Sequence, residues 1–209
     1  MTRDNKLGSR LRQFTCGSFL LAALLLTSAP FSISADDSKP VNAVIDATAM
    51  GTSTQLGRVI NVKVNIYEFS TDEDRAILIE AFKKGQNQGL VNALTKMKAV
   101  GHIAITGTLG YDLSFVRLIQ TPTGRKIRFV TNRLLRFGEV YYNTQTTAYN
   151  LTAGEFDLND TDKDKSSGVL YPAAQLVINK EGQLEFALNK NPWKLTNIID
   201  WNKVGMIEK

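Results

Sequence analysis

The sequence predicts a β-rich α+β fold: an antiparallel sheet of about eight strands, curled into a barrel or a sandwich, with one inserted helical hairpin. Short segments of alternating apolar and polar residues recur along the chain and are joined mainly by short turns. Helical periodicity is confined to one early stretch, which argues against a parallel α/β sheet. We expect residues 36–209 to form this fold as a single domain, with the helical hairpin at about residues 71–100.

The first 35 residues have the pattern of a cleavable secretory signal peptide. Residues 1–12 carry four basic side chains against one acid, and residues 19–26 (FLLAALLL) are continuously apolar. Cleavage is predicted after Ser34 or Ala35, where small residues follow the apolar run. That run is too short to span a bilayer, so we predict an exported protein, periplasmic or extracellular, with no transmembrane anchor after cleavage.

Removing residues 1–35 from the 209-residue chain leaves 174 residues, the size of one ordinary domain. Cys16 is the only cysteine and leaves with the signal, which excludes disulfides, thiolate metal sites and cysteine nucleophiles from the remainder. Four of the 25 basic and one of the 20 acidic residues leave too, so the remaining 21 and 19 give a charge of only +2. This balance does not indicate a nucleic-acid partner.

The first predicted strand covers residues 57–66, where Ile60, Val62, Val64 and Ile66 alternate with polar residues. A helix is predicted next, because residues 70–73 (STDE) resemble a capping box and apolar pairs recur four residues apart. We expect Gly85 to end this helix, and a second helix to run from about Gly89 to Gly101.

Strands and turns are expected after Gly101. The segment 121–124 (TPTG) predicts a tight turn between strands, with Pro122 at its second position and Gly124 in the left-handed conformation. A further hairpin is predicted to turn at residues 179–182. The predicted strands are residues 102–107, 111–120, 125–131, 139–143, 148–158, 170–178 and 183–188.

Residues 113–138 carry six basic side chains and no acid, although the rest of the chain beyond the signal is nearly balanced in charge. Lys126 and Arg128 share one face of a predicted strand, opposite Ile127 and Phe129. An anionic glycan, a lipid head group or an acidic envelope protein would suit such cations. The alternative is cross-strand pairing with acids such as Glu139, Glu155 and Asp157. The candidate ligand-binding cations are Arg117, Arg125, Lys126 and Arg128.

Aromatic residues concentrate in the second half of the chain and offer either core packing or a platform for stacking a sugar. Tyr141 and Tyr142 are added to the candidate ligand-binding residues, although adjacent strand residues point to opposite faces. Tyr149, Trp193 and Trp201 belong to the same group.

An acidic run is a weak candidate for an irregular Ca²⁺ site, because it places five oxygen-bearing side chains within eight residues. The run does not match the EF-hand spacing, and an ordinary solvated loop is the alternative. His102, the only histidine, opens a strand and is expected to be a half-buried structural residue rather than a base or a metal ligand. The acidic run comprises Asp157, Asn159, Asp160, Asp162 and Asp164.

These observations favour a non-catalytic domain of the cell envelope that binds a ligand or a partner protein. No cofactor is expected. One alternative is a glycan hydrolase that uses two carboxylates among Asp112, Glu139, Glu155 and Asp157, although no spacing selects a pair. The other is a structural or assembly protein with an exposed strand edge or a large apolar patch.

Overall fold

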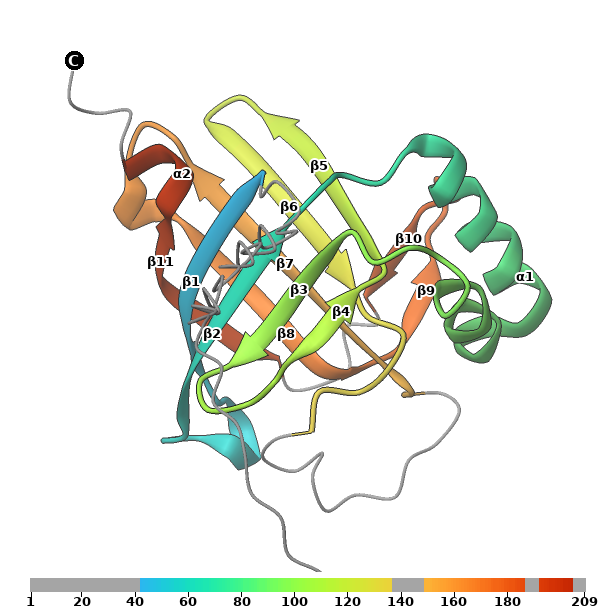
Figure 1. Ribbon diagram of the computed structural model, residues 1–209, viewed down its shortest axis with the longest axis horizontal. Coiled ribbons are helices and arrows are strands. Elements are labelled where there is room, and N and C mark those ends of the chain that lie inside the picture. The colour runs from blue at the N-terminus through green and yellow to red at the C-terminus, as the bar shows by residue number, and fades with distance from the viewer. Residues whose placement is uncertain (1–41, 137–148, 187–191, 205–209) are drawn as a thin grey trace, which may run out of the picture. The chain divides into compact units, whose positions relative to one another are not determined.

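The described strands form a nine-stranded antiparallel sheet in the order β4-β3-β2-β1-β11-β8-β7-β6-β5, with β9 and β10 as a separate pair (Figure 1). The computed structural model describes residues 42–136, 149–186 and 192–204, all within one compact unit. The predicted signal peptide and the predicted strand at 139–143 lie outside these residues. The strands of the large sheet are β1 (Ala43–Met50), β2 (Val59–Ile66), β3 (Gly101–Ile105), β4 (Tyr111–Leu113), β5 (Phe115–Thr121), β6 (Gly124–Val130), β7 (Leu151–Asn159), β8 (Ser167–Ala174) and β11 (Trp193–Asp200).

The two edge strands of the sheet are consecutive in the chain, because β4 ends at Leu113 and β5 begins at Phe115. Leu113 pairs with Gly101 of β3, whereas Phe115 pairs with Val130 of β6. The chain therefore bends at Ser114 and joins the two edges, so the sheet is nearly closed. The predicted curled antiparallel sheet is confirmed in this form, with more and shorter strands than expected.

Two strands escaped the sequence analysis, β1 and β11, and they pair with one another at the middle of the sheet order. In β1 three of the four buried positions hold alanine, Ala43, Ala47 and Ala49, beside Ile45, which gives only a weak apolar alternation. In β11 the alternation is interrupted near Asn197, which has a positive φ of 49° where the register with β1 shifts.

The two faces of the sheet bury separate apolar clusters. On the inner face, Ile45, Val64, Ile127, Phe156 and Leu195 belong to one large cluster. Leu151 and Ala153, also on β7, belong to a second cluster with residues of the helix. The helix α1 (Asp72–Leu94) therefore covers part of the outer face, and Figure 1 shows it beside β9 (Leu176–Ile178) and β10 (Leu184–Phe186).

The structure has the predicted capping box one residue later than expected, between Thr71 and Asp74 instead of Ser70 and Glu73. The Asp74 amide donates to Thr71 Oγ1 at 3.2 Å, and the Thr71 amide donates to Asp74 Oδ2 at 2.9 Å. The helix is broken at Gly85 and Gln86, which have non-helical backbone angles. A β-carbon at Gly89 would overlap the carbonyl of Ala81, so the second part folds back against the first. The helical segment is thus bent as expected, but it ends at Leu94, and Gly101 begins β3 instead.

Two further details differ from the sequence prediction. Gly124 does not have a positive φ; its lack of a side chain is needed because β7 approaches closely, and a β-carbon would overlap the carbonyl oxygen of Leu158. The strand expected at residues 170–178 is two strands, since β8 pairs with β7 and β11 whereas β9 pairs with β10. No helix within the described residues is long and apolar enough to cross a membrane.

Candidate functional site

A row of charged side chains crosses the outer face of three neighbouring strands. Arg117 of β5 lies directly opposite Arg128 of β6, which lies directly opposite Glu155 of β7. The next outward-facing pair along β6 and β7 is Lys126 and Asp157. Because side chains two apart on a strand share a face, the register brings three cations and two carboxylates together.

Lys126 and Arg128 are neutralised by these carboxylates. Arg128 Nε pairs with Glu155 Oε2, and Lys126 Nζ lies 2.7 Å from Asp157 Oδ2 and 3.3 Å from Glu155 Oε1. The hydrogen bond to Asp157 is the main cause that raises the pKa of Lys126 above its ordinary value. The cross-strand pairing that the sequence analysis gave as the alternative is therefore confirmed for Lys126 and Arg128.

Arg125 does not join the other predicted cations, because it lies on the opposite face of β6. Its guanidinium pairs with Asp200 Oδ2 at the end of β11 and lies 3.2 Å from Asp160 Oδ1. The side chains of Arg125 and Asp200 are each only 13% exposed. Arg125 therefore has a structural role, linking β6 to the last residue of β11.

Arg117 differs from the other predicted cations, because none of the ion pairs between described residues involves it. It is half-buried, and its charged neighbours include Arg75 on α1 as well as Arg128. Burial is the main cause that lowers the pKa of Arg117 from its ordinary value, and the Arg75 and Arg128 charges lower it further, against the opposing effect of Asp72. An arginine stays protonated at neutral pH even so. We call Arg75, Arg117 and Arg128 the arginine cluster.

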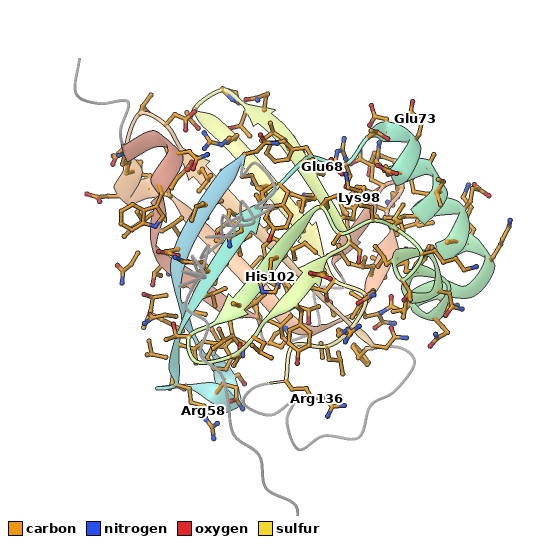
Figure 2. All side chains as sticks on the ribbon, viewed as in Figure 1. Arg58, Glu68, Glu73, Lys98, His102 and Arg136 are labelled. Atoms are coloured by element: carbon orange, nitrogen blue, oxygen red, sulfur yellow. The ribbon has the colours of Figure 1, made fainter. Side chains whose placement is uncertain are left out.

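The arginine cluster borders a small apolar cavity of about 60 Å³ between α1, the outer face of the sheet and the β9–β10 pair. A much larger open groove, about 880 Å³, lies between the two parts of α1 and the segment that follows it. That groove is lined by both basic and acidic side chains. Lys98 Nζ lies 2.8 Å from Glu68 Oε1, and both residues are labelled in Figure 2. The cavity beside the arginine cluster is the better candidate, because its charges are of one sign and Arg117 is not neutralised.

The acidic run is occupied by hydrogen bonds within its own loop. Asn159 Oδ1 accepts from the amides of Thr161 and Asp162, and Asp162 Oδ1 accepts from the amide of Asp164 at the short helix η3 (Lys163–Lys165). Asp157 binds Lys126, and Asp160 binds Arg125. Among the described residues, no group of three histidine, cysteine or acidic side chains is arranged to hold a metal ion.

His102, labelled in Figure 2, lies in β3 and contacts the loop that leads into β4. Its Nε2–H donates to the carbonyl of Leu109 at 2.9 Å, and Nδ1 lies 3.5 Å from Asp112, which is opposite in the β3–β4 pair. The side chain is 28% exposed. These contacts close the turn between the two strands.

The aromatic residues do not gather into one platform in the described part of the chain. Trp193, at the start of β11, is buried in the inner core. Trp201 follows the other end of that strand, is 49% exposed, and donates from Nε1 to Asp46 Oδ2 at 2.8 Å. Tyr141 and Tyr142 lie outside the described residues.

Three of the candidate carboxylates lie next to basic side chains. Glu155 and Asp157 lie two apart on the same face of β7 and both bind Lys126, while Asp112 lies beside His102. Glu139 lies outside the described residues.

The sequence analysis missed Arg75 as a member of the site. Nothing in its local pattern distinguishes it from other charged helical residues; only the packing of α1 on the sheet brings it near Arg117.

Comparison with known proteins found no match to this chain among family models, curated proteins or solved structures.

Proposed function

We propose that this chain is an exported, non-catalytic binding protein of the cell envelope that holds an anionic group at the arginine cluster. The observation that carries the proposal is the direct cross-strand pairing of Arg117 with Arg128, with Arg75 nearby from α1. Like charges directly opposite one another destabilise a sheet. Since Glu155 already offsets the charge of Arg128, a bound anion would mainly reduce the repulsion between Arg117 and Arg75.

The chemistry of the cluster supports a phosphate or carboxylate group as the anion. Each guanidinium presents a planar set of donors that binds such groups through two parallel hydrogen bonds. Glu155 already neutralises Arg128, so the positive charge that an incoming anion would meet comes mainly from Arg117 and Arg75. Burial strengthens these interactions, since water screens a half-buried charge less than an exposed one.

Titration calorimetry with inorganic phosphate at low ionic strength tests the proposal. We expect Arg117→Gln to weaken binding about tenfold or more, as expected for the loss of hydrogen bonds to a charged group. Arg58→Gln removes the same charge from an exposed position in the β1–β2 connection and should leave the affinity nearly unchanged. Equal weakening by both variants would show a non-specific charge effect, and absence of phosphate binding would overturn the proposal.

Export is the second part of the proposal and rests on the pattern of residues 1–35. Expression of the full chain in a bacterial host, followed by fractionation and intact mass measurement, tests it. We expect a mature chain in the exported fraction that begins at Ala35 or Asp36. A full-length chain retained in the cytoplasm would contradict it.

A further inference from the structure

We infer that the ligand is an amphiphile, with an anionic head at the arginine cluster and a single apolar chain whose first carbons enter the cavity beneath α1. This inference rests on the proposed function and specifies its ligand class. Three elements build the cavity walls: α1 with Leu78 and Leu90, the sheet with Phe115 and Val130, and the β9–β10 pair with Leu176 and Leu184.

The register of β5 and β6 places the apolar and the cationic parts of the site in adjacent rows. Phe115 lies opposite Val130 on the outer face, and both line the cavity. The next outward-facing pair along the same two strands is Arg117 and Arg128. Residues two apart on a strand are separated by about 7 Å, so the head and the first carbons of one molecule would reach both rows.

The arginine cluster and the apolar cavity would be filled by different chemical groups. An inorganic anion would satisfy Arg75 and Arg117 but would leave the apolar walls without contacts, and a neutral apolar molecule would leave the arginines uncompensated. A molecule with a charged head and an apolar chain contacts both.

The cavity size limits how much of the chain is held. Its volume, about 60 Å³, is about twice the roughly 30 Å³ that one water molecule takes in the liquid. The cavity therefore holds the first few carbons of a chain rather than a long chain or a second chain.

The decisive experiment compares inorganic phosphate, butyl phosphate and octyl phosphate by titration calorimetry, each below its micelle concentration. We expect the affinity to rise about fourfold for each methylene that enters the cavity and then to level off, so that octyl phosphate binds little better than butyl phosphate. Arg117→Gln should weaken binding of all three, whereas 1-butanol should bind much more weakly than butyl phosphate.

Cavity-filling variants test where the chain binds. Leu184→Phe, with Val130→Leu as a second variant, should abolish the gain from the butyl chain and leave phosphate affinity unchanged, with folding verified by circular dichroism. Leu109→Phe is the matched control, because Leu109 is 97% exposed. Equal affinities for phosphate and butyl phosphate, or a chain gain that survives in both folded variants, would overturn the inference and leave the proposed function standing. Failure of all the phosphates to bind would overturn both.

Discussion

The ring of Phe129 occupies the position that a β-carbon on Gly154 would take. The two residues are directly paired between β6 and β7, and an added β-carbon would lie within 2.8 Å of Cε1 and Cε2 of the ring. Phe129 is fully buried, with its ring centroid 5.6 Å from that of Phe156, so the ring has no free space into which to move.

Gly154→Ala is therefore expected to lower the free energy of unfolding by about 1–3 kcal/mol, the usual range for overpacking a core. Chemical denaturation measures this directly. Gly85→Ala is the matched control, since a β-carbon there meets nothing within 4 Å, and its stability should be close to that of the wild type. Equal stability of the two variants would contradict the packing described for Phe129.

Asn87 attaches the second part of α1 to the break between β8 and β9. Its Nδ2 donates to the Ala174 carbonyl at 2.8 Å, and its Oδ1 accepts from the Leu176 amide at 3.1 Å, in a site where Asn87 is 3% exposed. We expect Asn87→Ala to destabilise the fold by about 1–3 kcal/mol, because two buried backbone groups lose their partners. In Asn87→Ala the Leu176 amide should exchange its hydrogen faster than in the wild type. Asn92→Ala, on the exposed helix surface, should leave that exchange rate unchanged.

The ion pair between Arg125 and Asp200 should contribute measurably to stability, because both side chains are mostly buried. Asp200→Ala leaves Arg125 with only Asp160 and is expected to cost about 3 kcal/mol. A double-mutant cycle with Arg125→Met should give a clear coupling energy. Glu80→Gln, which removes the exposed pair with Lys83, should change stability very little. A coupling energy near zero would show that the two charges act independently.

Stability is expected to decrease as the pH rises above about 10. Burial raises the pKa of Tyr171 above its ordinary value of 10.0, and the hydrogen bond to Asp157 raises that of Lys126 above 10.5. In both cases the folded state holds its proton more tightly than the unfolded chain. The stabilisation is therefore present at neutral pH and is lost as the pH rises through the folded-state values.

Denaturation at a series of pH values between 9 and 11.5 tests this dependence. Tyr171→Phe keeps the ring and removes the titrating hydroxyl, so its stability should fall less steeply than that of the wild type. Lys126→Met should also flatten the curve. Curves of identical slope for all three proteins would mean that neither group has a raised pKa in the folded state.

Local patterns in the sequence determined much of the fold. The alternation of residues 60–66 fixed the buried face of β2, the predicted capping box located the start of α1 to within one residue, and Pro122 marked the turn between β5 and β6. Period-two alternation also separated Lys126 and Arg128 from Ile127 and Phe129. These features depend on neighbours in the chain, which is why they could be predicted.

Tertiary structure alone decided the rest. β1 and β11 are strands because they pair with each other and fill the inner core, not because their alternation is strong. The partner of Arg125 is Asp200, 75 residues away, and the arginine cluster depends on strand register and on the packing of α1. A sequence specifies which faces its strands and helices bury, but the partners across those faces follow from long-range packing, and the candidate site belongs to that second category.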